Sequence, residues 1–361
     1  MRVKLEDVCE RGTSSLMQKD IVDKNGKYPV YGASGRIGSM ETYQQEHQTV
    51  AVVKDGAGIG RTMLLPEKSS VIGTMQYLIP KNCIESEYLY YVVKYMHLEK
   101  YFSGATIPHI YFRDYKTEEF NLHDKTEQRE IVSTLKRIEA IISNRQEQLT
   151  KLDELVKARF VEMFGDPKLN PYRFPCNSLS TYITFLTSGS RGWSQYFTDS
   201  GEYFITIKNV KNCKITLQDV QYVAPPDNAE AKRTKVQKND LLISITADLG
   251  RTGVVTEEIA NHGAYINQHL TCIRLKDEQV NPLYVAYYME SDAGKEQFTA
   301  KNQSAVKAGL NFNAINSLKL MAPPLSLQNQ FADFVAEVDK SKLLAELFAQ
   351  NACILAENRS K

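Results

Sequence analysis

The most regular hydrophobic pattern in the chain lies between Thr126 and Gly165, where apolar residues recur at alternating spacings of four and three. This spacing is typical of a helix that packs along a narrow seam, as in a coiled coil. Arg145 and Arg159 interrupt the seam. The pattern predicts a helix roughly 55–60 Å long. The residues expected to face a partner helix are Ile131, Leu135, Ile138, Ile142, Leu149, Leu152 and Val156.

A second long helix is predicted from about Leu327 to Asn358, after Pro323 and Pro324, which cannot lie inside it. A long amphipathic helix standing alone exposes its apolar stripe to water, so each helix needs a partner. Each could pack against the other or against its own domain, and the narrow heptad seam favours mutual pairing. The pairing residues expected on this helix are Phe334, Val338, Ala345, Phe348, Ala352 and Leu355.

Short β-branched runs precede each helix, for example TVAVV at 49–53 and TCIRL at 271–275. These runs lie too close together for βαβ units, so an irregular antiparallel or mixed sheet with a few helices is expected. The fold class is therefore α+β, with two mixed α/β domains and two long helices. The expected boundaries are a first domain at 1–124, a central helix at 125–164, a second domain at 165–325 and a C-terminal helix at 326–361.

The chain repeats this organisation, with similar segments in the same order in both halves. VVKDGAGIGRTMLL, around Gly60-Arg61-Thr62, is similar to LLISITADLGRTGVV, around Gly250-Arg251-Thr252. The order of the matches predicts an internal pseudo-two-fold repeat. The other matching segments are Leu89-Tyr90 with Leu283-Tyr284, Ile110-Tyr-Phe-Arg with Leu310-Asn-Phe-Asn, and Gln128-Arg-Glu-Ile with Gln328-Asn-Gln-Phe.

Composition and charge exclude several classes of protein. The formal net charge is +1, so any basic surface for nucleic acid must be local. No run approaches the roughly 20 apolar residues that span a bilayer, and the N-terminus lacks the apolar core of a signal peptide. The six cysteines form no Cys-x-x-Cys pair and the six histidines have no metal-ligand spacing, so no metal site is expected. A reducing cytoplasm is the expected location.

The glycine-rich loop DGAGIGRT, residues 55–62, is superficially similar to a phosphate-binding loop. Its arginine stands where an NTPase loop has lysine, its glycines lack the dinucleotide spacing, and the second copy keeps one glycine of three. A nucleotide site is therefore not expected, and no other motif predicts a catalytic residue. Arg61 and Arg251 could each contact a nucleic-acid phosphate or pair with a nearby acid in a sheet turn.

Loops rich in Asn, Gln, Arg, Ser and Lys recur at matching places in both halves. Such side chains hydrogen-bond to base edges and neutralise phosphates. One such loop is usually ordinary surface, but the recurrence favours contact with DNA. The candidates in the first half are Tyr31, Ser34, Arg36, Lys54, Arg61, Thr62, Thr106 and His109. Those in the second half are Ser190, Arg191, Trp193, Lys208, Asn209, Arg251, Thr252, Asn267, Gln268, His269, Lys307, Asn311 and Asn313.

The whole chain resembles the specificity subunit of a type I restriction-modification system. The central helix with its LVKARFVEMFGDP end is the most specific part of this resemblance. The other segments that carry it are YPVYGASGRIG, the two Gly-Arg-Thr turns, TEQREIVSTLKRIE and PPLSLQNQFADFVAEVDKSK.

This resemblance implies a non-catalytic subunit of a phage-defence complex, in which each domain reads one half of a bipartite double-stranded DNA target. It implies that the two helices form an antiparallel coiled coil, set the spacing and dock two modification (methyltransferase) subunits. Two restriction (endonuclease and translocase) subunits can join such an assembly. S-adenosylmethionine, ATP and Mg are then expected on the partner subunits, with no cofactor in this chain. The alternative is a coiled-coil adaptor whose two domains bind protein.

Overall fold

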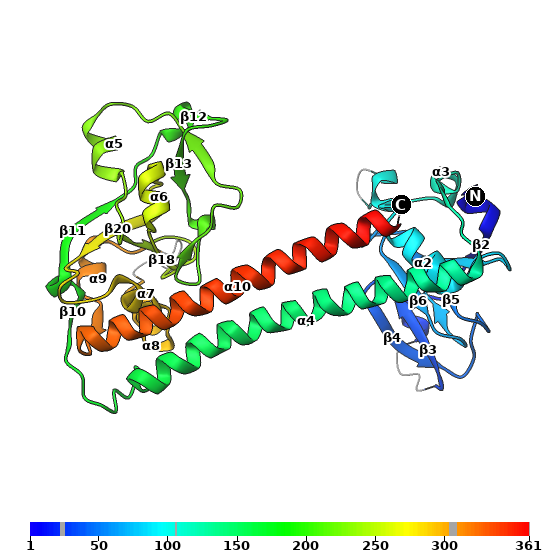
Figure 1. Cartoon of the computed structure of the whole chain (residues 1–361), viewed down its shortest axis with the longest axis horizontal. Helices are drawn as coiled ribbons and strands as arrows, with labels where there is room; N and C mark the ends of the chain where they lie inside the picture. The colour runs from blue at the N-terminus through cyan, green and yellow to red at the C-terminus, as the bar shows by residue number, and fades with distance from the viewer. Residues whose placement is uncertain (22–25, 105–106, 303–308, 361) are drawn as a thin grey trace. The chain divides into compact units, whose positions relative to one another are not determined.

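The computed structural model describes residues 1–21, 26–104, 107–302 and 309–360, with side chains described as far as residue 348. Contacts divide the chain into two compact units, Met1–Leu149 with Leu344–Lys361, and Thr150–Leu343. Each unit contains one domain of short strands and helices together with part of each long helix (Figure 1). The fold class is α+β, as predicted.

The first domain consists of short strands and a few short helices. Its helices are α1 (Leu5–Val8), α2 (Ser86–Lys94) and α3 (Phe112–Tyr115), with 3-10 turns η1 (Gln18–Asp20) and η2 (Leu98–Tyr101). Its strands are β1 (Arg2–Lys4), β2 (Cys9–Thr13), β3 (Tyr28–Gly32), β4 (Gly35–Met40), β5 (Thr49–Val53), β6 (Thr62–Leu65), β7 (Ser70–Val71), β8 (Met75–Pro80) and β9 (Glu119–Asn121).

Two small sheets form the body of this domain. The strand order is β2-β8-β5-β6 in one sheet, which is antiparallel, and β4-β3-β7 in the other, where β3 and β7 are parallel. Strand β1 pairs separately with β9. Val50 and Leu78 of the first sheet, with Leu89 of α2, lie in a core that α2 covers. Strand β5 is buried on both faces, which explains its continuous apolar run.

The second domain has more elements than the first. Its helices are α5 (Ala229–Thr234), α6 (Glu257–His262), α7 (Pro282–Glu290), α8 (Asp292–Lys301) and α9 (Phe312–Asn316), with 3-10 turns η3 (Leu179–Tyr182), η4 (Trp193–Tyr196) and η5 (Ile207–Asn209). Its strands are β10 (Cys176–Ser178), β11 (Ile183–Ser188), β12 (Phe197–Thr198), β13 (Glu202–Ile205), β14 (Val210–Lys211), β15 (Lys214–Ile215), β16 (Gln221–Val223), β17 (Leu241–Ser244), β18 (Thr252–Val254), β19 (Ala264–Ile266), β20 (Leu270–Leu275) and β21 (Lys319–Met321).

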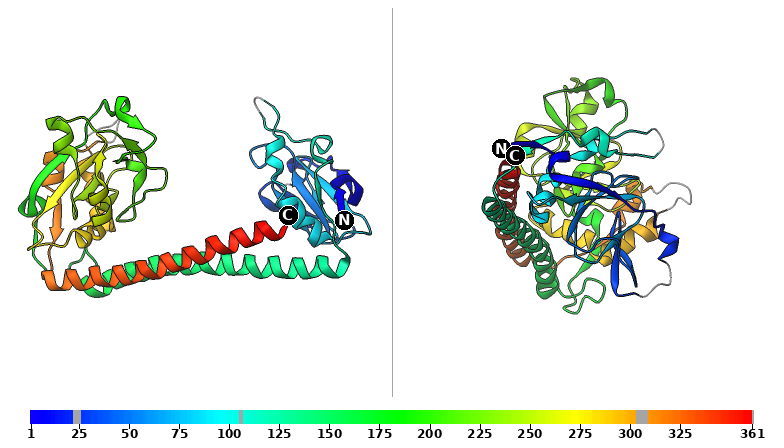
Figure 2. Two further views of the ribbon diagram at one scale, coloured as in Figure 1. Left: turned by 45° about the horizontal axis from the view of Figure 1, so that its top comes forward. Right: turned by 90° about the vertical axis from the view of Figure 1, so that its right-hand side faces the viewer.

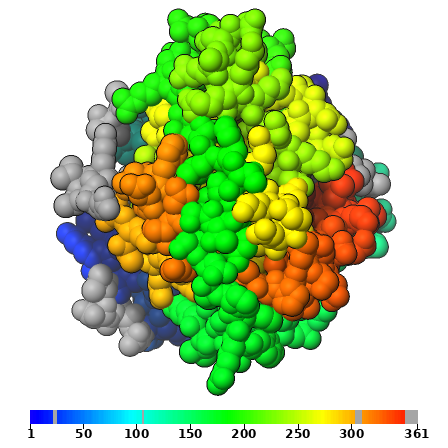
Figure 3. Space-filling model, turned by 90° about the vertical axis from the view of Figure 1, so that its left-hand side faces the viewer, coloured from blue at the N-terminus to red at the C-terminus, as the bar shows by residue number. Residues whose placement is uncertain are grey.

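The second domain repeats the topology of the first. Its sheet β11-β20-β17-β18 corresponds strand for strand to β2-β8-β5-β6, and β16-β13-β19 corresponds to β4-β3-β7, including the single parallel pair. Strand β10 pairs with β21 as β1 pairs with β9. On the face shown in Figure 3, the green chain that follows the central helix accordingly lies beside the orange chain that leads into the last helix. The predicted internal repeat is confirmed at the level of topology.

A buried glutamine marks the repeat most directly. The Gln128 Oε1 accepts a hydrogen bond of 2.8 Å from the backbone N–H of Glu85, the residue before α2. The Gln328 Oε1 accepts an equivalent bond of 2.8 Å from the N–H of Asn281, the residue before α7. Both glutamine side chains are fully buried. The predicted match of Gln128 with Gln328 is therefore confirmed.

One predicted match is wrong by two residues. The Tyr88 hydroxyl donates to the carbonyl of Asn121 and the Tyr284 hydroxyl to that of Met321, each at 2.8 Å. Tyr88 is thus the counterpart of Tyr284, whereas the sequence match paired Tyr90 with it. The Leu-Tyr dipeptide occurs in both helices by coincidence, and the buried hydroxyl sets the true register.

The two long helices are α4 (Lys125–Phe164) and α10 (Leu325–Ser360). The Asp124 carboxylate caps α4 by accepting hydrogen bonds from the backbone N–H groups of Thr126 and Glu127 at 2.9 and 3.0 Å. Gly165, at φ 72°, ends it in the left-handed region. Helix α10 begins directly after Pro323 and Pro324, as predicted.

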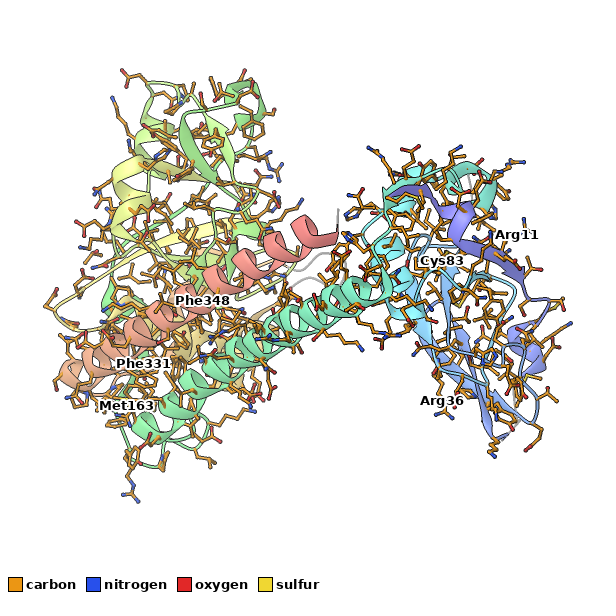
Figure 4. The ribbon with its side chains drawn as sticks, turned by 45° about the vertical axis from the view of Figure 1, so that its right-hand side comes forward. Arg11, Arg36, Cys83, Met163, Phe331 and Phe348 are labelled. Carbon is orange, nitrogen blue, oxygen red and sulfur yellow. The ribbon has the colours of Figure 1, made fainter. Side chains whose placement is uncertain are left out.

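Within each unit the two helices lie side by side and run antiparallel (Figure 2). In the second unit, Phe164 near the end of α4 packs on Phe331 near the start of α10, with ring centres 5.7 Å apart. Asp153, earlier on α4, pairs with Lys342, later on α10. Figure 4 shows Met163 and Phe331 on this paired stretch. In the first unit, Arg145 lies over Phe348.

The predicted pairing residues divide between the helix pair and the domains. Ile131, Leu135 and Ile138 pack in the core of the first domain, which corrects their assignment to the partner helix. That alternative, packing on the helix's own domain, therefore holds for the start of α4. In the second unit one apolar cluster joins both helices to the domain, and its predicted members are Leu152, Val156, Phe334 and Val338.

The remaining pairing residues differ in exposure. Ala345 is buried, Ile142 and Leu149 are half-buried, and the Phe348 side chain is 58% exposed. Phe348 is therefore covered only in part by Arg145, where a buried seam position was expected. The predictions for Ala352 and Leu355 concern side chains outside the described residues.

Candidate nucleic-acid interface

The two Gly-Arg-Thr turns have the same backbone geometry, as predicted. Gly60 has φ 81° and Gly250 has φ 80°, values that favour glycine. The Gly60 N–H donates to the carbonyl of Val53 at 2.9 Å, and the Gly250 N–H donates to that of Ser244 at 3.0 Å. Each turn joins an inner strand of its sheet to the antiparallel edge strand beside it, β5 to β6 or β17 to β18. The shared glycine is therefore needed for its backbone conformation. The additional glycines of the first copy belong to a loop that the second copy does not share.

The two arginines make different contacts. The Arg61 Nη1 donates to the carbonyl of Ala33 at 2.8 Å, which ties the turn to the β3–β4 hairpin. The Arg251 Nε donates to Asp248 at 2.5 Å within its own turn. Arg251 thus makes the acid pair that the sequence left open as an alternative. Arg61 nevertheless stays exposed.

Three loops of the first domain meet beside this turn. The Gly56 N–H donates to the carbonyl of Pro108 at 2.9 Å, and the His109 Nδ1 lies 2.7 Å from the Asp55 Oδ1. With the Arg61–Ala33 bond, these contacts join the β5–β6 loop, the β3–β4 hairpin and the segment that ends at residue 110. We call this set of loops the first loop cluster, residues 33–36, 54–62 and 107–110. The structure thereby brings together the predicted residues Ser34, Lys54, Arg61 and His109.

Of the other first-half candidates, Arg36 and Thr62 also belong to the cluster, Tyr31 lies beside it, and Thr106 is outside the described residues. Arg36 on β4 is exposed and lies opposite Tyr31 in the hairpin (Figure 4). Tyr31 is half-buried, and the Thr62 hydroxyl donates back to the carbonyl of Gly60 at 3.2 Å. The prediction for Thr106 lies outside the described residues.

The first loop cluster contains a negative charge as well as positive ones. Partial burial raises the pKa of Asp55, but hydrogen bonds from Lys54 and His109 lower it further, so the pKa lies below its ordinary value. The Lys54 Nζ is 2.8 Å from the Asp55 Oδ2. At neutral pH the carboxylate is therefore ionised, and it offers acceptor oxygens among the basic groups.

The second domain has an equivalent cluster at the corresponding sheet edge. The Ile245 N–H donates to the carbonyl of His269 at 3.0 Å, and the Leu310 N–H donates to the carbonyl of Ile245 at 2.9 Å. Ser190 forms an isolated β-bridge with Asn267, and Thr246 forms one with Gly309. We call this set the second loop cluster, residues 188–191, 245–251, 267–269 and 309–313. It brings together the predicted residues Ser190, Arg191, Arg251, Asn267, Gln268, His269, Asn311 and Asn313.

Four second-half candidates are buried, which corrects their assignment as DNA contacts. Thr252 is 0% exposed, and its hydroxyl and N–H both donate to Glu290 of α7. Trp193 is 5% exposed, because it packs against Phe204 in a small apolar core. The other two, Asn209 and Ser190, are 2% and 7% exposed.

Local hydrogen bonds explain these last two positions. The Asn209 Oδ1 accepts from the N–H and the hydroxyl of Thr206, which closes the η5 turn. The Ser190 hydroxyl accepts from the Arg233 Nη2 at 3.3 Å. Asn and Ser favour such turn-closing bonds, and sequence alone does not distinguish these positions from exposed loop positions.

The remaining second-half candidates are half-buried or exposed, and the half-buried ones are Arg251, Asn267, Gln268 and His269. Arg191, Lys208 and Asn313 have exposed side chains. Asn311 is also exposed, but its Oδ1 accepts a bond of 2.8 Å from the N–H of Ala314 and caps α9. The prediction for Lys307 lies outside the described residues.

Sequence reasoning missed two residues of the clusters and one that supports them. Asp55 and Thr246 occupy equivalent bridge positions, opposite His109 and Gly309. The match of the two Gly-Arg-Thr segments could have identified them, since both lie shortly before the turn glycine. Arg233 on α5 donates to the carbonyl of Ser188 at 3.0 Å and anchors that loop. Helix α5 has no counterpart in the first domain, so the repeat did not point to it.

The described residues offer no obvious site for chemistry. Among them, no group of three or more His, Cys, Asp or Glu side chains is placed to hold a metal ion. Burial raises the pKa of the Cys9 thiol to about 12, which makes it a poor nucleophile. No helix in the described part of the chain is long and apolar enough to cross a membrane.

Comparison with known proteins assigns the family. The model of the type I restriction modification DNA specificity domain family matches residues 1–153 and 194–349. The chain belongs to this family. The two matched stretches contain most of both loop clusters, so the duplicated topology corresponds to two specificity domains in one chain.

Relatives of the specificity domain include curated and solved proteins. The chain is 20% identical over 140 residues to the type I restriction enzyme EcoBI specificity subunit of Escherichia coli, an alignment that covers 38% of this chain and 28% of that protein. The chain thus aligns with less than a third of this curated relative.

The fold is similar to that of solved specificity subunits. The type I restriction-modification S subunit from M. genitalium superposes with a TM-score of 0.61 at 15% identity, covering 100% of this chain and 95% of that one. A chain from a structure of type I R-M complex assembly and conformational transition gives 0.59 at 15% identity, covering 100% and 96%. At these identities the likeness shows a shared fold.

Proposed function

We propose that this chain is the DNA sequence-recognition subunit of a type I restriction-modification complex. The observation that carries the proposal is that equivalent loop clusters lie at corresponding positions of the two equivalent sheets, in a chain whose two halves both match the specificity-domain family. Each loop cluster presents exposed Arg or Asn side chains and half-buried Gln or His side chains, which are the groups that contact phosphates and base edges. Each cluster therefore reads one half of a bipartite double-stranded target.

The two long helices have a separate role in this proposal. They set the spacing between the half-sites and dock two methyltransferase subunits, to which two restriction subunits can be added. S-adenosylmethionine, ATP and Mg belong to those partners, and the chain itself is non-catalytic and works in the cytoplasm. The domain division follows the same logic, with recognition by 1–124 and 165–325 and assembly by 125–164 and 326–361.

A domain exchange tests the division of labour. Residues 1–124 are replaced by the corresponding domain of another family member, and the chain is expressed with its methyltransferase partner. Sequencing of methylated DNA is expected to show a split motif in which only one half has changed. A change in both halves, or in neither, contradicts the proposal.

Binding to duplex DNA separates this function from that of a protein adaptor. Affinity in the presence of the methyltransferase subunits is expected to fall steeply with salt, with a linear log–log slope that reports the phosphate contacts. Arg36→Ala is expected to reduce the slope by about one unit, if that exposed arginine contacts a phosphate. A complex that does not bind duplex DNA favours the adaptor.

A further inference from the structure

Both loop clusters contain a three-residue hydrogen-bonded chain with a histidine. In the first cluster the Lys54 Nζ bonds the Asp55 Oδ2 at 2.8 Å, and the Asp55 Oδ1 lies 2.7 Å from the His109 Nδ1. In the second, the Thr246 Oγ1 lies 2.6 Å from the His269 Nδ1, and the His269 Nε2 lies 3.1 Å from the Gln268 Nε2. In each of these hydrogen-bonded triads, the histidine is bound through its Nδ1.

The two histidines reach this position from different segments. Asp55 and Thr246 are equivalent, because each follows a residue that bonds the backbone of two flanking segments in the same way. The bridge partner of Asp55 is His109, whereas that of Thr246 is Gly309. His269 comes instead from the β19–β20 turn, whose counterpart in the first domain contains Thr74. In both domains, therefore, this position contacts a histidine Nδ1, although the histidine comes from a different segment in each domain.

The hydrogen bonds determine what each chain of residues can offer to a ligand. The ionised Asp55 only accepts, so the His109 Nδ1 carries a hydrogen, and among the described residues the His109 Nε2 has no hydrogen-bond partner. The His269 Nε2 accepts from the Gln268 amide, which leaves the Gln268 carbonyl oxygen and its second N–H for other partners. His109 and Gln268 are both half-buried.

We propose that His109 and Gln268 are specificity-determining residues, one for each half of the DNA target, and that Asp55, Thr246 and His269 position them. A Gln amide can pair with both the N6 donor and the N7 acceptor of adenine, so Gln268 reads an adenine in the major groove. The His109 Nε2, which the Asp55 contact leaves available, forms a hydrogen bond to a base edge in the other half of the target. This inference rests on the proposed function.

The experiment measures base preference at each target position in the assembled complex with its methyltransferase subunits. Methylated host DNA is sequenced for the wild-type chain and for Gln268→Ala, His109→Ala and Thr246→Val. Gln268→Ala is expected to lower the preference for one adenine by about tenfold to a hundredfold, in one half of the motif only. His109→Ala is expected to relax one position in the other half. Thr246→Val is expected to relax the same position as Gln268→Ala, by a smaller factor.

Two further variants keep the test decisive if truncation disturbs the loops. Gln268→Glu keeps the size of the side chain and replaces its donor by an acceptor, so the preferred base is expected to shift from adenine towards cytosine. The matched controls are His47→Ala and Gln237→Ala, which change exposed residues of the two domains outside the clusters. Both controls are expected to leave the motif unchanged.

The outcomes separate this inference from the proposed function. If the wild-type chain directs no split motif, the proposed function itself fails. If the wild type directs a split motif and the variants either retain it unchanged or lower methylation equally at all positions, the specificity role is wrong and these residues only support the loops. A change in base preference confined to one half supports the inference.

Discussion

The guanidinium carbon of Arg159 on α4 lies 5.7 Å from the centre of the Phe334 ring on α10. Arg145 has the same relation to Phe348 at 5.4 Å. The two arginines are two heptads apart, as are the two phenylalanines. The residues that interrupt the apolar seam of α4 are thus those that cover an aromatic ring of the antiparallel partner.

A double-mutant cycle tests this contact. Arg159→Ala, Phe334→Leu and the double variant are expected to show a coupling free energy of about 0.5–1 kcal/mol, typical of a partly exposed cation–π pair. Urea unfolding is followed by the fluorescence of Trp193, the single tryptophan, which is buried in the second domain. A coupling of zero means that the ring and the guanidinium are close without interacting.

Gln328→Ala is expected to destabilise the second unit by about 2–3 kcal/mol. The substitution leaves the N–H of Asn281 and the carbonyl of Pro323 without their partner in a fully buried position. Trp193 fluorescence during urea unfolding measures the change. Gln330→Ala, an exposed glutamine on the same helix, is the matched control and should lie within about 0.5 kcal/mol of the wild type. Equal effects of the two substitutions contradict a structural role for Gln328.

Alanine substitutions at two glycines with nearly the same φ distinguish the cost of backbone strain from the cost of a steric clash. Gly250, at φ 80°, has the Phe298 ring 2.4 Å from the position of an added Cβ, whereas Gly192, at φ 82°, has open space there. Gly192→Ala is expected to cost about 1–2 kcal/mol from the left-handed backbone alone. Gly250→Ala is expected to cost about 1–3 kcal/mol more, because the ring must move. Similar losses in urea unfolding would mean that the ring moves freely.

The ion pair at Glu118 predicts a dependence of stability on pH. Burial raises the pKa of this carboxyl, but hydrogen bonds from Lys100 and Tyr101 lower it further, to below the usual 4.5. The unfolded chain then binds the proton more readily, so this stabilisation is present above about pH 4.5 and is lost as the pH falls through the folded-state pKa.

Urea unfolding of wild type and Glu118→Gln, followed by circular dichroism, measures this contribution. The wild type is expected to be the more stable at pH 7, and the difference is expected to shrink as the pH falls below about 4.5. A difference that stays constant over this range shows that the Glu118 carboxylate does not titrate with folding.

The sequence by itself determined the parts of this protein whose physics is local. The alternating four- and three-residue spacing of apolar positions, with Gly165 after the first helix and Pro323 and Pro324 before the second, places α4 and α10 within one or two residues of their observed ends. The common order of matching segments in the two halves determined the repeat. The shared Gly-Arg-Thr turn could be recognised as well, because only glycine readily adopts the φ near 80° that both turns need.

Tertiary structure alone decided which polar side chains face outward. Asn209 and Thr252 have the composition of a loop surface, yet bonds to Thr206 and Glu290 bury them. The pairing of Asp55 with His109, and of Thr246 with His269, joins residues far apart in the chain. No periodicity encodes such contacts, since they depend on how loops from separate strands meet at a sheet edge. The members of each loop cluster therefore became visible only in the folded chain.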